Sequence, residues 1–170
     1  QAYVEFGGDC VAPLLKEFPN LVMQRTFSKA GTLAGLRVGY YAASPDIAEQ
    51  IAKAKLPYNL NFFSMAVAAI VVRNWHRFEP VIARIRSERE RVYAALRSMA
   101  GVRVYPSAAN FLLFETDRPP AEVFRGVYDR GVLIRDVSKY PLLGKALRVS
   151  IGTPEENDAF LSALRATLGA

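Results

Sequence analysis

The sequence holds a single cysteine, Cys10, and a single histidine, His76, among its 170 residues. One cysteine cannot form an internal disulfide, so a disulfide-stabilised fold is excluded and a reducing compartment, the cytoplasm, is favoured. No apolar run approaches the roughly 20 residues that a membrane helix needs, so we expect no membrane partner. A lone histidine without a triad or a set of metal ligands favours packing or a surface position, so we expect no metal site.

The chain also lacks an initiator methionine and any basic leader segment. Residues 1–6 have the composition of the middle of a β-strand. We therefore expect further sequence upstream of Gln1.

Charge of one sign is not concentrated anywhere, although the formal net charge is +6. The densest basic stretch is interrupted by Glu88 and Glu90 and comprises Arg84, Arg86, Arg89, Arg91 and Arg97. A solvated helix face with i,i+4 ion pairs explains this pattern better than a phosphate-binding stripe. We therefore expect no nucleic-acid partner.

Short β-rich runs alternate with helical patterns in the first part of the chain. Residues 21–27 and 38–42 are predicted to be buried strands. Ser44 followed by Pro45 predicts the start of a helix that reaches about Lys55. Residues 63–75 are apolar over a helical length and are expected to face another element or subunit. A long amphipathic helix is predicted from Glu79-Pro80 to near Met99.

The pattern after Gly101 predicts a compact β-β-α-β-β-α module. The predicted elements are strands at 102–105 and 111–115, a helix at 121–130, strands at 132–135 and 146–150, and a last helix from Pro154 to near Leu168. The predicted organisation is therefore an N-terminal part over 1–79, a connecting helix over 80–100 and a small domain over 101–170.

The polar chemistry gathers in the segment from Arg25 to Tyr40, which reads RTFSKAGTLAGLRVGY. Ser28 and Lys29 fall in the turn after the first strand, and Arg37 opens the next one, where α/β folds place ligands. Gly31 and Gly35 are expected to let the backbone bend tightly. An amine can bond an aldehyde covalently, while a guanidinium and a hydroxyl can hold a phosphate. The alternative is a surface lysine and an arginine paired with a carboxylate.

The whole string resembles the cofactor-lysine segment of fold-type I aminotransferases that depend on pyridoxal 5'-phosphate, in particular the histidinol-phosphate aminotransferase branch. Five further segments resemble that branch in the same order: Ala2-Tyr-Val-Glu-Phe6, Pro57-Tyr-Asn59, Ala109-Asn-Phe111, Gly131-Val-Leu-Ile-Arg-Asp136 and Leu147-Arg-Val-Ser-Ile-Gly-Thr-Pro-Glu-Glu-Asn157. The resemblance covers essentially the whole chain. It implies an α/β fold in which the chain forms the last part of the large mixed-sheet domain and a complete small α+β domain.

The resemblance also implies roles for residues near the cofactor. Lys29 would hold pyridoxal 5'-phosphate covalently and carry the proton during catalysis. Ser28 and Arg37 would bind the cofactor phosphate, and Tyr3 would hydrogen-bond its phenolic oxygen.

For the substrate, the resemblance implies that Arg148 binds the acidic group beside the reacting carbon and that Arg135 is a second anion contact. One pocket would serve the carboxylate of glutamate and the phosphate of histidinol phosphate, because a guanidinium can bind either in a forked geometry. Asp136 either orients Arg135 or is a loop carboxylate, and Asn110 either caps a strand end or approaches the ligand. Tyr58 lies either in a turn or near the interface of the homodimer that the family implies.

Two departures from the family pattern stand out. Gly31 and Thr32 occupy positions where the family has an aromatic residue and a glycine. The aspartate that keeps the cofactor's pyridine nitrogen protonated would lie just before Gln1, so we expect the 170 residues alone to lack transaminase activity. The alternatives are a relative acting on aromatic amino acids, a threonine-phosphate decarboxylase or, in another class, a truncated and inactive interaction module.

Overall fold

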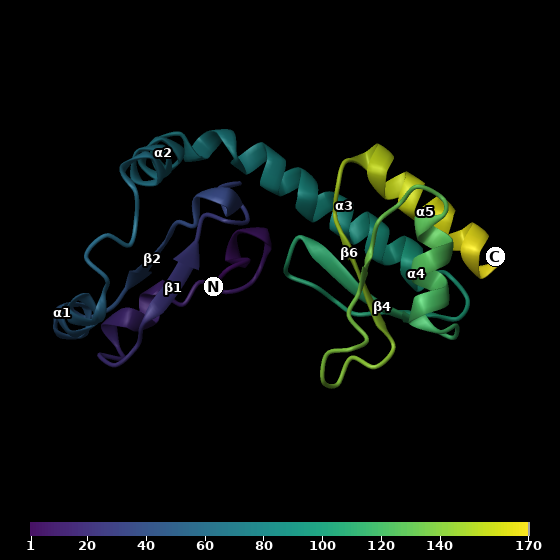
Figure 1. Ribbon diagram of the computed structural model, residues 1–170, viewed down its shortest axis with the longest axis horizontal. Helices are drawn as coiled ribbons and strands as arrows, with labels where there is room; N and C mark the ends of the chain where they lie inside the picture. Colours follow the sequence, from purple (N-terminus) through teal and green to yellow (C-terminus); the bar gives the residue numbers. More distant parts are fainter. Residues whose placement is uncertain (170) are drawn as a thin grey trace. The chain divides into compact units, whose positions relative to one another are not determined.

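The computed structural model describes residues 1–169, which form two compact units that divide after Ile82 (Figure 1). Helix α3 (Glu79–Arg97) begins in the first unit and continues in the second. The expected assignment of residues 80–100 to a connector between two functional domains stays a prediction. In the described residues, no helix has both the length and the apolar character that a membrane crossing needs.

The first unit is built around an antiparallel ladder of two strands, β1 (Met23–Thr26) and β2 (Gly39–Ala42). Both strands lie inside the predicted ranges. The prediction of burial is wrong for β2, because Tyr40 and Tyr41 are 44% and 38% exposed. No further described strand pairs with this ladder, so it stays two strands wide and buries little of its own surface.

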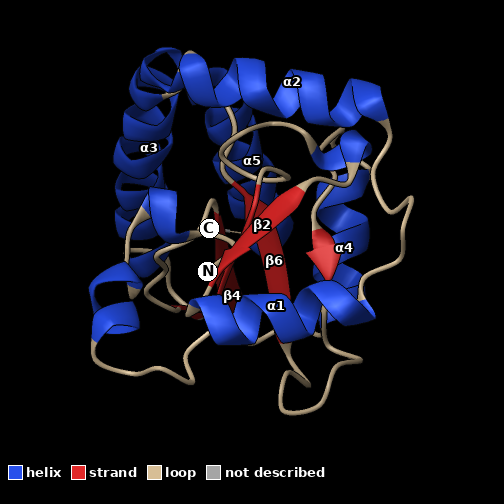
Figure 2. Ribbon diagram, turned by 90° about the vertical axis from the view of Figure 1, so that its left-hand side faces the viewer, coloured by secondary structure: helices blue, strands red, loops and turns tan. Residues whose placement is uncertain are grey.

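Helices α1 (Pro45–Ala54) and α2 (Phe62–Arg73) lie beyond opposite ends of this ladder (Figure 2). The predicted helix start after Ser44 is confirmed, but the Ser44 hydroxyl donates to the carbonyl of Pro19 at 3.0 Å instead of capping the helix. The first unit also contains four short 3₁₀ helices: η1 (Val4–Phe6), η2 (Ala12–Lys16), η3 (Ala34–Leu36) and η4 (Trp75–Arg77).

The expectation of a strand over residues 1–6 is wrong. Tyr3 has φ −126° and ψ 8°, which turns the chain into η1, and the Phe6 amide donates to the Tyr3 carbonyl at 2.9 Å. The 3₁₀ turn presents the Tyr3 ring and the Glu5 carboxylate towards different neighbours, a geometry that an extended strand does not give.

The second unit contains a four-stranded antiparallel sheet in the order β3-β4-β6-β5. The strands are β3 (Val102–Val104), β4 (Phe111–Thr116), β5 (Arg135–Asp136) and β6 (Ala146–Ser150). With α4 (Pro120–Tyr128) and α5 (Pro154–Leu168) they confirm the predicted β-β-α-β-β-α order. The strand predicted at 132–135 is largely wrong, because the Val132 amide returns to the Val127 carbonyl and ends the helix instead.

Alternation along β4 and β6 decides which face of this sheet is covered. Leu112, Phe114, Leu147 and Val149 point into a core that also contains residues of α3, α4 and α5. Helices α4 and α5 lie side by side over this face (Figure 1). Because successive residues of a strand point to opposite faces, Arg148 lies on the face away from these helices.

The basic stretch of α3 is not a fully solvated face. Glu88 and Arg89 are only 9% and 8% exposed. Arg91 donates to Glu88 at 2.8 Å and to Asp158 of α5 at 2.6 Å. The expectation of a solvated face is therefore wrong for this part of α3, whose charged side chains take part in packing the second unit.

Gly126 marks a close approach between α4 and α5. A Cβ atom added to Gly126 would lie 2.9 Å from Thr167 Oγ1 and would also press on Thr167 Cγ2.

Alanine normally stabilises a helix interior relative to glycine by roughly 0.5–1 kcal/mol, whereas overpacking costs about 1–3 kcal/mol. We predict that Gly126→Ala lowers the free energy of unfolding by about 1–2 kcal/mol, measured by urea denaturation. Thr167→Ala in the same chain should restore most of the loss, and a single variant as stable as the parent would contradict the packing described.

Candidate active site

The segment between β1 and β2, residues 27–38, contains Lys29 and is called the lysine turn; it begins where the β1–β2 ladder ends. The last ladder pair is Thr26 opposite Gly39, and the next amide, that of Phe27, donates to the carbonyl of Val38 at 3.1 Å. Continuing the same register brings Ser28 and Arg37 to one end of the ladder. Arg37 does not open the strand as expected, because it ends η3 two residues before β2 starts.

The tight bend of this turn is made by residues other than the expected glycines. Thr32 and Arg37 have φ values of 58° and 56°, whereas Gly31 and Gly35 are outside the positive-φ region. Gly31 instead permits a close approach, since a Cβ there would lie 3.0 Å from the Phe27 carbonyl oxygen. Non-glycine residues with positive φ are uncommon and cluster at functional sites, because the surrounding structure must hold them there.

Lys29 lies next to the ring of Tyr3. The Lys29 ammonium is 5.3 Å from the centroid of that ring, and the lysine side chain is exposed. A cation over an aromatic face is attracted by the ring's quadrupole. The structure therefore brings together two residues that are distant in sequence, the predicted cofactor lysine and the predicted phenol.

Ser28 and Arg37 present hydrogen-bond donors at the same turn. The Ser28 amide donates to Thr26 Oγ1 at 3.1 Å, and the two hydroxyl oxygens are 2.9 Å apart, so Thr26 orients Ser28. Arg37 Nη1 donates to the carbonyl of Ala34 at 2.9 Å, and its side chain is exposed. A hydroxyl and a guanidinium at one strand end are suited to a phosphate.

The second unit pairs the two arginines that were expected to bind substrate. Arg135 of β5 lies directly opposite Arg148 of β6, so both side chains are on one face of the sheet. Arg148 Cζ is 5.1 Å from the ring centroid of Phe111, and Arg135 Nη2 donates to the Tyr140 hydroxyl at 3.2 Å. Like charges directly opposite each other are unfavourable in a sheet, so this pair favours a bound anion.

Asp136 and Asn110, which neighbour the arginines, make hydrogen bonds with backbone amides. Asp136 Oδ1 accepts from the Ser138 amide at 2.8 Å, and hydrogen bonds from the Ser138 hydroxyl and amide hold the pKa of Asp136 below its ordinary value. The Asp136 carboxylate therefore closes its own turn. The carbonyl of Asn110 accepts from the Ile151 amide at 2.9 Å, which extends the β4–β6 ladder by one step.

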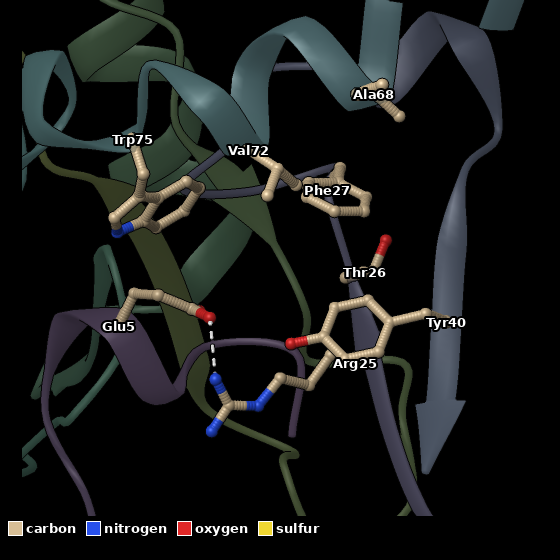
Figure 3. Close-up of a pocket in the computed structure, with 9 residues that line it drawn as sticks. Glu5, Arg25, Thr26, Phe27, Tyr40, Ala68, Val72 and Trp75 are labelled. Carbon is tan, nitrogen blue, oxygen red and sulfur yellow. Dashed lines mark ion pairs between the residues drawn. The ribbon is translucent and has the colours of Figure 1, made fainter. Parts of the chain in front are cut away.

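A pocket of about 580 Å³ in the first unit is lined by Thr26 and Phe27 but by none of the predicted cofactor residues (Figure 3). Its apolar walls come from the ladder and from α2 and η4: Phe27, Tyr40, Ala68, Ala69, Val72 and Trp75. The pocket also contains an ion pair, with Arg25 Nη1 3.5 Å from Glu5 Oε1, as the dashed line shows. Because these two charges pair with each other, this pocket is a weaker candidate for a catalytic site than the lysine turn.

Cys10, His76 and Tyr58 lie on the surface. Cys10 is exposed, and its Sγ accepts from Arg25 Nη2 at 2.9 Å. His76 is exposed in η4, and Tyr58 is 97% exposed in the link between α1 and α2. Residues 1–169 contain no group of three or more histidine, cysteine or acidic side chains placed to hold a metal ion.

The family model for aminotransferase class I and II matches residues 1–164. The chain belongs to this family. It is 43% identical over 164 residues to histidinol-phosphate aminotransferase 1 of Carboxydothermus hydrogenoformans, covering 96% of this chain and 46% of that protein. It is also 43% identical to the histidinol-phosphate aminotransferase of Roseiflexus castenholzii, covering 97% and 45%. The chain thus spans about half the length of these aminotransferase relatives.

Solved structures of the family share this fold. The histidinol-phosphate aminotransferase from Clostridium acetobutylicum superposes with a TM-score of 0.90 at 24% identity, over all of this chain and 53% of its own. The L-threonine-O-3-phosphate decarboxylase from Porphyromonas gingivalis gives 0.89 at 28% identity, with coverage of 100% and 54%. The Sinorhizobium meliloti histidinol-phosphate aminotransferase in complex with pyridoxal-5'-phosphate gives 0.82 at 26%, with coverage of 99% and 47%. The expected fold-type I aminotransferase fold is therefore confirmed.

Sequence reasoning missed three side chains that hold the candidate site residues in place: Thr26, Phe111 and Tyr140. Thr26 is adjacent to the lysine motif and has a hydroxyl, which was a usable signal. Phe111 lies in a segment that resembles the family, but neither it nor Tyr140 showed a signal for contact with an arginine, because only the strand register and the loop path bring them there.

The arginine pair leads to a prediction on stability. In the absence of anions, Arg135→Gln should raise the free energy of unfolding by roughly 0.2–1 kcal/mol, because it removes a like-charge cross-strand pair. Inorganic phosphate should stabilise the parent protein more than the variant, since a ligand that binds only the folded state raises stability. Thermal denaturation with and without phosphate measures both effects.

Arg165→Gln is the matched control, because it removes the same charge from an exposed position on α5 of the same unit. If both variants respond to phosphate as the parent does, the pair does not bind anions.

Proposed function

We propose that the protein containing this chain is a pyridoxal 5'-phosphate-dependent aminotransferase that converts histidinol phosphate and 2-oxoglutarate to imidazole-acetol phosphate and glutamate. The observation that carries the proposal is the position of Lys29, beside Tyr3 and in the turn that also presents Ser28 and Arg37. Support comes from relatives 43% identical to the chain that are named histidinol-phosphate aminotransferases.

The residues of the lysine turn fit the cofactor group by group. The Lys29 amine suits the aldehyde, the Tyr3 phenol suits the phenolic oxygen, and the Ser28 hydroxyl with the Arg37 guanidinium suits the phosphate. When bound, the cofactor supplies an electrophilic aldehyde and a ring that withdraws electrons from the substrate's α-carbon.

Within this proposal, Lys29 has two tasks. Its Nζ would hold the cofactor before the reaction, and in its free amine form it would carry the proton between the substrate's Cα and the cofactor's C4′. The Tyr3 ring attracts the protonated amine and so keeps Nζ near the site between transfers. The strained backbone at Thr32 and Arg37 fixes the turn on which these groups stand.

The arginine pair supplies the contacts for the acidic groups of the two substrates. A guanidinium forms forked hydrogen bonds with either a carboxylate or a phosphate. The Phe111 ring fixes the plane of Arg148, and Tyr140 holds one end of Arg135. One pair of cations can therefore accept glutamate and histidinol phosphate in turn.

We also propose that the protein is a cytoplasmic homodimer. Helix α2 is apolar around its whole circumference, and it exposes Phe62, Phe63 and Ile70, which are 82%, 65% and 56% accessible. An exposed apolar surface of this kind supports a subunit contact. The exposed free thiol of Cys10 is compatible with a reducing compartment.

A phosphate-bearing substrate with a different reaction is the second candidate, because the decarboxylase of L-threonine-O-3-phosphate shares the fold at 28% identity. Histidinol phosphate has no carboxylate to lose, so the two activities are separated by their products. Assays of the protein extended to the length of its relatives should show glutamate formed from 2-oxoglutarate. Carbon dioxide released from O-phosphothreonine without glutamate formation would favour the decarboxylase.

We predict that borohydride reduction of the cofactor-loaded, full-length protein attaches the cofactor to Lys29. Peptide mapping should find the label on this lysine, and Lys29→Ala should abolish turnover, because the covalent link and the proton carrier are lost together. Lys53→Ala is the control, since Lys53 is an exposed residue of α1 paired with Glu49. Label on a lysine other than Lys29 would overturn the assignment, and a protein that takes no label at all would favour the inactive interaction module.

We predict that Arg148→Lys lowers kcat/KM for both substrates by roughly ten- to a hundredfold, because an ammonium keeps the charge but loses the forked geometry. Arg103→Lys is a close control, since Arg103 also lies over an aromatic ring, that of Tyr105, at 5.0 Å on the same sheet. Steady-state kinetics with glutamate and with histidinol phosphate measure the effect. Equal efficiency of the two lysine variants would argue against a substrate contact at Arg148.

A further inference from the structure

Helix α3 places ionised side chains inside the second unit, where each has a defined partner. Glu88 and Arg89 are 9% and 8% exposed, and a buried charge is tolerated only when paired and hydrogen-bonded. Arg89 contacts the backbone before β4, at Ala109, and Glu88 contacts Asn157 of α5, whose side chain bonds the backbone after β6, at Gly152. These two backbone segments lie next to the Phe111–Ser150 end of the β4–β6 pair. This end of the ladder is adjacent to Arg148.

The segment after β6 is held through Asn157. This residue is 3% exposed, and its Nδ2 donates to Glu88 Oε2 at 2.8 Å and to the Gly152 carbonyl at 3.1 Å. Its Oδ1 accepts from the Gly152 amide at 3.0 Å. Hydrogen bonds from Arg91 and Asn157 hold the pKa of Glu88 below its ordinary value, so the anchor of this chain of contacts stays ionised.

The segment before β4 is held through Arg89. Its Nη1 donates to the Ala109 carbonyl at 2.9 Å, and the hydroxyl of Ser107 donates to the Phe111 carbonyl at 2.7 Å. Phe111 is the residue whose ring lies beneath the Arg148 guanidinium. The Arg89 contact therefore fixes the backbone that leads into β4, whose first residue, Phe111, contacts Arg148.

A backbone hydrogen bond joins the two segments. The Ile151 amide donates to the Asn110 carbonyl at 2.9 Å, between Gly152 on one side and Ala109 on the other. The contacts from α3 thus hold the backbone on both sides of this hydrogen bond, which lies just beyond the end of β6 and three residues after Arg148.

We propose that Asn157, anchored by Glu88, and Arg89 are positioning residues that hold Arg148 over Phe111 in readiness for the substrate's anionic group. The proposal rests on the proposed function, in which Arg148 binds that group. A binding residue held in place before the ligand arrives loses less freedom on binding, so its affinity depends on such support. None of the three residues needs to touch substrate for this effect.

Asn157→Ala in the full-length, cofactor-loaded protein tests the proposal. It removes the three hydrogen bonds to Gly152 and Glu88 and leaves Arg148 itself intact. We expect KM for glutamate and for histidinol phosphate to rise roughly tenfold, with kcat changed less than about threefold, because a misplaced contact weakens binding of both anions. Asp158→Asn is the control on the same helix, since Asp158 is exposed and contacts Arg91 without touching Gly152.

Equilibrium binding provides a readout that does not require turnover. Titration calorimetry with glutarate and with inorganic phosphate should show Kd raised by a similar factor in Asn157→Ala and unchanged in Asp158→Asn. Arg148→Lys is the reference for loss of the direct contact. If Asn157→Ala does not fold, Arg89→Lys tests the other side of the step, and the same rise in Kd is expected there.

The outcomes separate this proposal from the function on which it rests. A parent protein that binds glutarate through Arg148 but does not transaminate histidinol phosphate refutes the proposed function alone. KM and Kd unchanged in both Asn157→Ala and Arg89→Lys refute the positioning role while the function stands. A loss of thermal stability without a change in Kd also refutes it, because a purely structural role gives that result.

Discussion

The antiparallel register between β4 and β6 is the constraint on which the second unit depends. It pairs Leu113 with Arg148 and thereby sends Leu112, Phe114, Leu147 and Val149 to the face covered by helices. A slip of one residue would exchange the two faces and bury the guanidinium of Arg148 in the core. The alternation that buries these apolar side chains therefore also places Arg148 on the opposite face, where the β5–β6 register brings Arg135 beside it.

The second unit contains buried charges that have hydrogen-bond partners and two cations that face each other. Glu88 and Arg89 are buried; Glu88 accepts a hydrogen bond from Asn157, and Arg89 donates one to the Ala109 carbonyl. Arg135 and Arg148 face each other across two strands with the same sign of charge. Folding alone gains nothing from the repulsion between two facing cations, which supports the anion site proposed for this pair.

In the first unit, too, the strand register places the candidate site residues. The β1–β2 register carries the chain into the lysine turn, and the hydrogen bond between Phe27 and Val38 extends it by one step. Two strands alone are marginal in water, and β2 keeps Tyr40 and Tyr41 exposed. The chain covers about half of its aminotransferase relatives, so the chemistry proposed for this turn belongs to the longer protein.

The sequence by itself determined the α-helices, the order of elements along the chain in the second unit, the turn that holds Ser28 and Lys29, and the family. These features follow from local periodicity, from proline and capping residues near helix starts, and from a continuous motif. Only the tertiary structure decided that Thr32 and Arg37 carry the strained backbone, that η1 replaces a strand, and that Arg135 stands opposite Arg148. It also decided that Glu88 is buried against Asn157, which lies 69 positions away. Strand register and the burial of charge arise from contacts between distant residues, so no local pattern contains them.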